Sequence, residues 1–389
     1  MVRGSLGNQP RTPDAASTTG VVVVLNVVAI ATFLVLPTVV DGAERSLHFT
    51  DRDVGFLSAI NMAGSMVSAI GAKFWVRRVP WARAVRTALL GLACANALSL
   101  VFQDRGGFLA LQCVAGFFGG SLYSLTLTVL SDTRQPDRNF GLAVAAQVVF
   151  QVMGLLAGPT LLAVGGIDVL LTGFALLCLL ALPLARFVPD RGRRVSAQVT
   201  FAALLGARTL LALMGCFFFL LNAGCYWTYV NDMGHSAGLG EQQIASGLAL
   251  GVSAGLLGAL LASWIGARFN RNASLAIGAL LIVAAAWLLA GPLTIAEFTL
   301  SSALFNFAWN YSLSYQYAAV NATDPSGHSV AVAPAFHTAG AALGPAIAAL
   351  LVTPSHYTSV IWLVDAGAIV SLVCFLASAR LANAARTHN

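Results

Sequence analysis

The chain has 389 residues, and only 9% of them are charged, against about 25% in an ordinary soluble domain. Hydrophobic residues make up 58% and come in uninterrupted blocks rather than short alternating strands, which excludes a water-soluble enzyme and an outer-membrane barrel. The formal net charge is +6, but the basic residues form short clusters between the apolar blocks. This pattern indicates membrane topology rather than nucleic-acid binding.

Twelve apolar blocks follow one another, each long enough to cross a bilayer once. They predict an all-α integral membrane protein with spans at 21–41, 54–75, 84–103, 107–130, 140–164, 168–187, 208–230, 242–266, 273–291, 296–319, 329–352 and 358–380. The polar head, residues 1–20, lacks the early apolar stretch of a cleavable signal, so we expect the first span to be retained. We expect bundles at 21–187 and 208–380, a linker at 188–207 and a tail at 381–389.

Basic residues are distributed unequally between alternate connections. With the amino terminus inside, all but three of the 21 Lys and Arg residues lie on the inner side, and only Arg45, Arg52 and Arg105 are outside. One helix more or fewer would reverse the side of every later connection, so the asymmetry also supports the count of twelve. It predicts a cytoplasmic (inner) membrane protein with both termini, and the linker, in the cytoplasm.

The cysteines carry no metal-binding or redox pattern. All six lie inside predicted spans, without Cys-x-x-Cys spacing or nearby His clusters: Cys94, Cys113, Cys178, Cys216, Cys225 and Cys374. We expect them to be small core residues and expect no disulfide, metal site or cofactor. No catalytic nucleophile motif is present in the sequence, and we assign no catalytic residue.

An internal repeat divides the chain into halves. Residues 141–159 align without gaps to 327–345 at an offset of 186, with seven of 19 positions identical. Both copies keep the order Gly-x-x-x-Gly-Pro, as Gly154, Gly158 and Pro159 in the first and Gly340, Gly344 and Pro345 in the second. The repeat predicts two pseudo-symmetric six-helix bundles.

Two six-helix halves joined by a basic linker resemble the major facilitator superfamily. The resemblance covers nearly the whole chain and implies the fold of that family. The Gly-x-x-x-Gly-Pro order is similar to that family's fifth-span antiporter motif, although the terminal pair, Gly165 and Gly166, arrives three residues late. Small residues four apart also let helices pack closely, and proline permits a bend. A gating role and a packing role are both open.

The connections after the second and eighth spans resemble the family's gate motif. Arg77 and Arg78 stand in the first copy and Arg268 and Arg271 in the second, while the motif's aspartate is replaced in both. Such basic residues also contact helix carboxyl ends and acidic lipid. We therefore keep gating and topology as alternative roles for the four arginines.

Two ionisable residues lie deep in predicted spans, where such groups are functional candidates. His337 is in the eleventh span and Asp365 in the twelfth, each about 12 Å from opposite faces of a ~30 Å core. Because histidine titrates near neutral pH, the two are candidates for proton coupling. The alternative is a satisfied buried polar pair, and the resemblance gives Asp365 a supporting role outside the central cavity.

Polar residues recur on single faces of several predicted helices, in spans that the resemblance implies line a central cavity. The predicted substrate-binding residues are Asn26, Asn61, Tyr123, Gln147, Gln151, Asn222, Tyr226, Asn306, Trp309, Asn310 and His337. For each one, hydrogen bonding between helices without ligand contact is the alternative. We expect Trp227, Tyr229, Tyr315 and Tyr317 to be anchors at the membrane interface.

No Lys or Arg lies deep in a predicted span, which favours a neutral or weakly cationic organic solute over an anion. We expect a secondary active transporter working by alternating access, coupled to protons and favouring efflux. Its expected partners are the solute, protons and the lipid bilayer, with no nucleic acid, and we expect a monomer. The alternatives are a proton-coupled uptake symporter, a membrane-embedded enzyme using His337 and Asp365, and a transporter-derived sensor.

Overall fold

The computed structural model describes residues 15–49, 51–192, 206–291, 293–324, 328–351 and 357–387, which fold almost entirely as helices. Most of the expected linker and both chain ends lie outside the described residues. The elements are α1 (Ala16–Ala29), α2 (Ala31–Leu34), α3 (Leu36–Leu47), α4 (Asp51–Trp75), α5 (Trp81–Leu98), α6 (Arg105–Ser131), α7 (Pro136–Ala181), η1 (Leu182–Phe187), α9 (Ala207–Ser236), α10 (Glu241–Ile265), η2 (Gly266–Arg268), α11 (Arg271–Trp287), α12 (Ile295–Asn321), α13 (His328–Leu351) and α14 (Thr358–Thr387).

The first rod is broken twice, into α1, α2 and α3. Ile30 and Val35 leave helical geometry at the two breaks, with φ values of −121° and −114°. Pro37 follows the second break and has no N–H to bond back to the carbonyl of Phe33. The rod therefore changes direction on its way across the bundle.

Helix α7 contains two rods that meet at a glycine turn. Gly165 and Gly166 have non-helical dihedral angles, and the φ of 61° at Gly166 lies in the left-handed region that glycine adopts without steric cost. The N–H of Ile167 donates to Ser46 Oγ at 3.1 Å, which ties the turn to the end of α3. With α1–α3 counted as one rod and α7 as two, the described helices form twelve rods.

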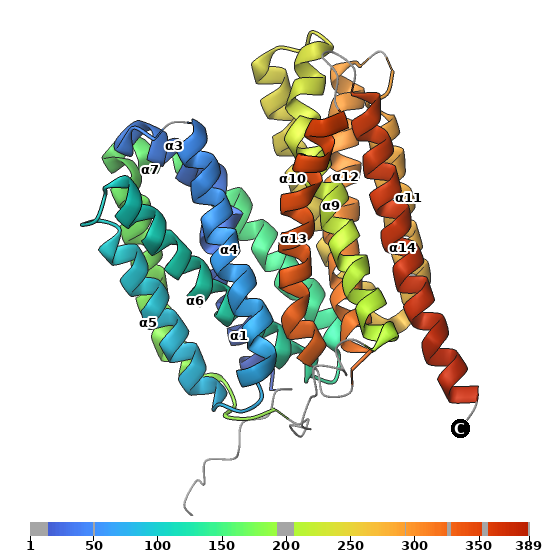
Figure 1. Ribbon diagram of the computed structural model, residues 1–389, viewed down its shortest axis with the longest axis horizontal. Helices are drawn as coiled ribbons and strands as arrows, with labels where there is room; N and C mark the ends of the chain where they lie inside the picture. The colour runs from blue at the N-terminus through green and yellow to red at the C-terminus, as the bar shows by residue number, and fades with distance from the viewer. Residues whose placement is uncertain are drawn as a thin grey trace, which may run out of the picture.

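The rods are grouped into two bundles, α1 to η1 and α9 to α14, which Figure 1 shows side by side. Glycines hold equivalent pairs of rods together in each bundle. A Cβ at Gly154 or Gly158 of α7 would meet Val35 or Thr38 of the first rod, and one at Gly340 or Gly344 of α13 would meet the backbone of α9. The repeated glycines therefore have the same packing role in both halves. The Pro159 side chain lies outside the described side chains.

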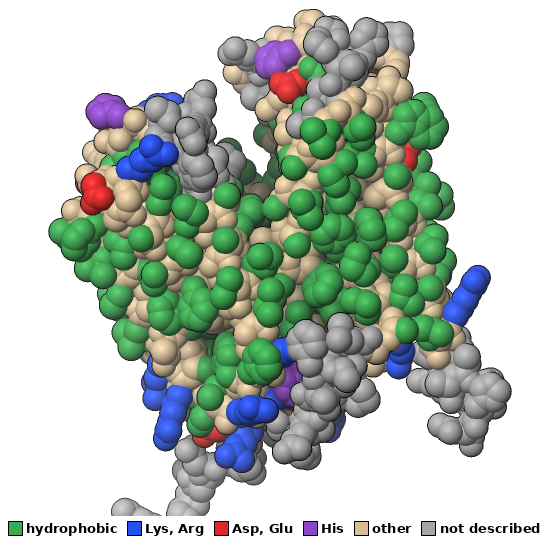
Figure 2. Space-filling view, in the orientation of Figure 1, with side chains coloured by type: hydrophobic (Ala, Val, Ile, Leu, Met, Phe, Trp, Pro, Cys, Tyr) green, Lys and Arg blue, Asp and Glu red, His purple; other side chains and the backbone are tan. Residues whose placement is uncertain are grey.

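On the face shown in Figure 2, a broad apolar belt covers both bundles, and most of the visible Lys and Arg side chains gather along one edge. By length and composition, seven described helical segments are long and apolar enough to cross a membrane, and shorter apolar helices accompany them. We call the edge where α4 and α6 end and α11 begins the basic end. At the opposite end, Figure 2 shows a hollow between the two lobes.

The cysteine side chains differ in burial. Cys178, Cys216, Cys225 and Cys374 are buried, whereas Cys94 is exposed on the outer face of α5, so the expected core position is wrong for Cys94. A small, weakly polar thiol is accepted on an apolar surface as readily as in a core.

Candidate functional site between the two bundles

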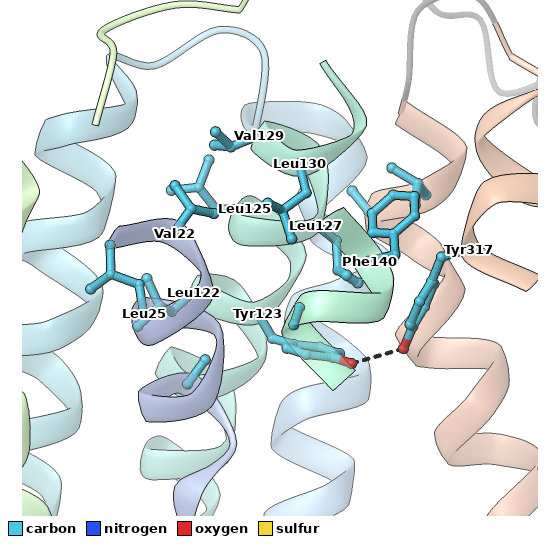
Figure 3. Close-up of a cluster of buried hydrophobic side chains, with 14 of the residues drawn as sticks. Val22, Leu25, Leu122, Tyr123, Leu125, Leu127, Val129, Leu130, Phe140 and Tyr317 are labelled. Atoms are coloured by element: carbon cyan, nitrogen blue, oxygen red, sulfur yellow. Dashed lines mark hydrogen bonds between the residues drawn. The ribbon is translucent and has the colours of Figure 1, made fainter. Parts of the chain in front are cut away.

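The two bundles meet through a hydrogen bond between tyrosines. Tyr123 on α6 and Tyr317 on α12 share a bond of 2.8 Å between their hydroxyls, drawn as the dashed line in Figure 3. Both side chains are buried, and the ring of Tyr317 also packs against Phe140 of α7, with 5.7 Å between centroids. Tyr317 was expected at the membrane interface. It is buried instead, because a phenol whose hydroxyl has a partner is readily accommodated in a core.

A polar network lies behind Tyr123 in the first bundle. Gln147 Nε2 donates to Asn26 Oδ1 at 2.6 Å, and Asn26 Nδ2 donates to Thr126 Oγ1 at 2.9 Å. Asn26 is fully buried and Gln147 is 6% exposed. Three predicted site residues from α1, α6 and α7 therefore lie in one hydrogen-bonded region.

His337 lies on the other side of Tyr317, in the second bundle. Its Nε2 lies 3.1 Å from Gln316 Oε1, and its ring packs edge-on against Tyr317, with 5.3 Å between centroids. The His337 side chain is 7% exposed. Tyr317 thus contacts His337 on one side and Tyr123 on the other, joining the predicted residues of both halves.

Asp365 has a different partner from His337. Asp365 Oδ2 accepts from Trp287 Nε1 of α11 at 2.7 Å, and its carboxylate lies inside the second bundle. This contact joins two helices of the same bundle, α11 and α14. His337 and Asp365 are therefore held by separate hydrogen bonds on separate helices.

Several predicted residues face neighbouring helices of their own bundle. Asn222 donates to the carbonyl of Phe219 at 2.7 Å, and its Cβ is 2.8 Å from the position a Cβ at Gly367 of α14 would take. Asn306 and Asn310 of α12 donate to their own helix, and Asn310 packs over Gly255 of α10. These three asparagines lie at helix contacts within the second bundle.

Two further predicted residues are half-buried in the first bundle. Asn61 Nδ2 donates to the carbonyl of Gln112 at 3.1 Å and so belongs to the contact between α4 and α6. Gln151 lies one turn beyond Gln147 on α7 and is also half-buried. Gln151 therefore continues the polar face of α7 toward the end opposite the basic end.

Aromatic rings line the second bundle where α9 faces α12. Tyr226 stacks on Phe305 at 3.8 Å, and Tyr226 also shares a 2.8 Å hydrogen bond with Ser301. Trp227 and Trp309 are half-buried, with 6.3 Å between their centroids, and both meet the Phe305 ring edge-on. The ring contacts hold both indoles in fixed orientations. Trp227 thus belongs to this aromatic cluster and not to an interface belt.

Polar contacts at the basic end tie the bundles together. Arg271 of α11 donates to both carboxylate oxygens of Asp137 on α7, at 2.9 and 3.1 Å. Ser263 Oγ donates to the carbonyl of Arg138 at 3.1 Å, and Asn321 Nδ2 to that of Ser131 at 3.5 Å. We call these three contacts the basic-end closure.

A buried ion pair lies at the same end within the first bundle. Arg77 donates to both oxygens of Asp132, at 2.6 and 2.7 Å, and the two side chains are 2% and 0% exposed. The neighbouring Arg78 and the Arg268 side chain are exposed. The four predicted arginines are thus divided into two with carboxylate partners and two facing outward.

Sequence reasoning missed four residues of this region: Gln316, Tyr317, Asp132 and Asp137. The two aspartates lie between the predicted spans 107–130 and 140–164. Two acidic residues on either side of Arg134, in a connection on the side rich in Lys and Arg, are the signal that could have indicated ion pairs at the basic end.

Comparison with known proteins gives both a curated relative and solved structures. The chain is 27% identical over 150 residues to the efflux pump azaK of Aspergillus niger, a match that spans 36% of this chain and 31% of that protein. The human organic anion transporter MFSD10 (TETRAN) superposes with a TM-score of 0.73 and 15% identity over 93% of this chain and 99% of that one. The E. coli fucose:proton symporter FucP gives a TM-score of 0.75 and 12% identity over 92% and 98%.

These structural likenesses concern the fold, because their identities are low. The family profile of the Major Facilitator Superfamily matches residues 21–333, which is most of the chain. Because this match covers well over half of the chain, the chain is a member of the major facilitator superfamily of membrane transporters.

Proposed function

We propose that this protein is a proton-coupled secondary transporter that exports a small neutral or weakly cationic organic solute across the cytoplasmic membrane. The bundles would rock about the region of Tyr123 and Tyr317 and open it to either side in turn. Solute, protons and lipid are its proposed partners, and the proposed unit is a monomer that binds no nucleic acid.

The observation that carries this proposal is the hydrogen bond between Tyr123 and Tyr317. It brings Asn26 and Gln147 of one half close to His337 of the other, around one central region. A binding region shared by two bundles is suited to alternating access, since rocking changes the contacts on one side while the residues of each half keep their own partners.

The conformation supports a chamber that opens away from the basic end. The basic-end closure holds the bundles together at that end. The hollow lies at the opposite end. With the basic end in the cytoplasm, as the distribution of Lys and Arg favours, this is an outward-facing state.

The proposed substrate class rests on the side chains around the centre. Amides, phenols and one imidazole surround Tyr123 and Tyr317, and the two indoles Trp227 and Trp309 lie farther along α9 and α12. Such groups suit an apolar or ring-containing body with a few hydrogen-bonding atoms. The arginines described above and their partners Asp132 and Asp137 lie at the basic end, where they are paired or face outward. Asp365 lies inside the second bundle, where it accepts from Trp287.

His337 is the proposed proton-coupling residue. It is buried in the second bundle and contacts Tyr317, whose hydroxyl bond to the first bundle changes when the bundles separate. A change of surroundings between conformations is what allows one group to take up a proton on one side and release it on the other. Asp365 is proposed to support α14 through Trp287 rather than to exchange protons with His337.

Transport and binding can be tested in two steps. A thermal-stability screen of the purified protein against neutral, cationic and anionic solutes identifies ligands, because binding to the folded state raises the melting temperature. The stabilising solute is then followed in proteoliposomes under a pH gradient of either sign. Solute movement opposite to the direction of proton flow supports proton-coupled export, and solute movement in the same direction as the protons supports the uptake alternative. In the stability screen, stabilisation by anions alone rejects the proposed substrate class.

A further inference from the structure

A small cavity lies inside the second bundle, away from the chamber. It has a volume of about 10 Å³ and is lined by residues of α9, α11, α12 and α14. Its walls are mostly apolar, from Phe219, Ile282 and Ala368 among others, but Ser312 and Gln316 of α12 and Ser371 of α14 also line it. Ser371 Oγ already donates to the carbonyl of Gly215. Ser312 and Gln316 are four apart and so lie on one face of their helix.

Both polar side chains bring an unpaired atom to this cavity. Gln316 is 0% exposed and Ser312 is 2% exposed. Among the described residues, Gln316 Nε2 and Ser312 Oγ have no hydrogen-bond partner. A buried amide or hydroxyl without a partner destabilises the folded state, so a native core satisfies such groups with protein or with water.

We propose that this cavity is a buried water site, in which one water accepts from Gln316 Nε2 and hydrogen-bonds to Ser312 Oγ. The volume is at the lower limit that admits one water molecule. A cavity with two convergent polar atoms is hydrated, whereas a purely apolar one of this size stays dry.

The water fixes the orientation of Gln316 and, through it, that of His337. With Nε2 of the amide turned to the water, Oε1 faces His337 Nε2 at 3.1 Å and accepts from it. The imidazole proton then sits on Nε2, and Nδ1 carries the lone pair that takes up a second proton. Gln316 is thereby a positioning residue for His337, a consequence that rests on the proposed coupling role.

The first test fills the cavity. Ala279 also lines it, so Ala279→Val displaces the water and leaves the amide unpaired. We expect the melting temperature of the full-length protein in detergent to fall by about 2 °C or more. In a Gln316→Leu background, which has no amide to leave unpaired, Ala279→Val should lower the melting temperature less or raise it. Ala368→Val repeats the test from the α14 side.

A dry void gives the opposite result. Extra methyl groups would then raise the melting temperature, or change it equally in both backgrounds, and the water site would be rejected. Gln316→Met replaces Gln316→Leu if the leucine variant does not fold. None of these measurements involves transport, so the water site and the proposed transport function succeed or fail separately.

The second test reads the histidine tautomer. Imidazole ¹³C and ¹⁵N chemical shifts of isotope-labelled His distinguish a proton on Nε2 from one on Nδ1, and a His337→Asn sample assigns the signal. We expect the Nε2–H tautomer in the unmodified protein and a mixture in the Ala279→Val and Gln316→Leu variants. An Nδ1–H tautomer in the unmodified protein, or no change in the variants, would overturn the positioning role of Gln316.

Discussion

Tyr123 and Tyr317 belong to different bundles, yet their hydroxyls share a hydrogen bond of 2.8 Å. Each bundle supplies one of the two hydroxyls, so the bond exists only while the bundles are in contact at Tyr123 and Tyr317. Its loss should change the balance between conformations rather than the stability of either bundle.

Replacing either tyrosine with Phe removes the bond and leaves the ring in place. A buried hydrogen bond is worth about 0.5–1.5 kcal/mol, so we expect Tyr123→Phe to raise the inward-facing population about 2-fold to 10-fold. Spin labels on Arg78 and Arg268, which are exposed on opposite halves, report the distance between the bundles by electron resonance. Tyr229→Phe, on the outer part of α9, is the matched control, and an equal effect there would contradict the assigned role.

The contact between Asp137 and Arg271 should act as a gate. Asp137→Asn and Arg271→Gln each remove an ion pair whose carboxylate is 5% exposed, and both should lengthen the same label-to-label distance. The exchange Asp137→Arg with Arg271→Asp should restore the shorter distance, because it restores the attraction. If the exchanged protein resembles the single variants, the attraction between the two charges is not what closes the basic end.

The pair of Arg77 and Asp132 should matter for folding more than for gating. Its side chains are 2% and 0% exposed, and a buried charge left alone costs about 3–5 kcal/mol. We expect Arg77→Ala to lower the melting temperature strongly, and Arg78→Ala, at an exposed neighbouring position, to leave it nearly unchanged. Similar melting temperatures for the two variants would refute this distinction.

The indoles should contribute to solute affinity. For a ring-containing solute from the stability screen, Trp309→Ala should weaken binding about 2-fold to 10-fold, which corresponds to the 0.5–1.5 kcal/mol of an aromatic pair. Trp264→Ala removes an indole that is 71% exposed on the outer face of α10 and serves as the control. Equal affinities in both variants would exclude Trp309 from the binding region.

The fold could be predicted from the sequence because each membrane span is recognised from its own residues, independently of the other spans. Apolar blocks of the length of a bilayer gave the rods, and the internal repeat paired Gly154 with Gly340 and Gly158 with Gly344. The turn between the fifth and sixth rods lies at Gly165 and Gly166, where the sequence leaves a gap between two spans. A turn of this kind needs a residue with positive φ, which glycine adopts without steric cost, so the glycine pair between two apolar blocks indicates the turn.

The site was harder to predict, because a helical repeat reveals which residues share a face but not what that face meets. Asn222 has a polar side chain of the kind that lines a cavity, but it packs against α14 at Gly367. Tyr317 was expected at an interface, and its partner Tyr123 is 194 residues away. Contacts between residues so far apart in the sequence depend on how the rods are arranged in space. The periodicity of polar residues within a single rod carries no information about that arrangement.

The most direct test of the account is two-sided accessibility of a cysteine in the proposed chamber. Gln151→Cys, in a background with the six native cysteines replaced, is labelled by a membrane-impermeant thiol reagent from either side of sealed vesicles. The account predicts labelling from the outer side in the resting protein, and labelling from the cytoplasmic side once Asp137→Asn opens the basic end. Absence of labelling from both sides in both proteins would contradict a chamber that opens alternately between the two bundles.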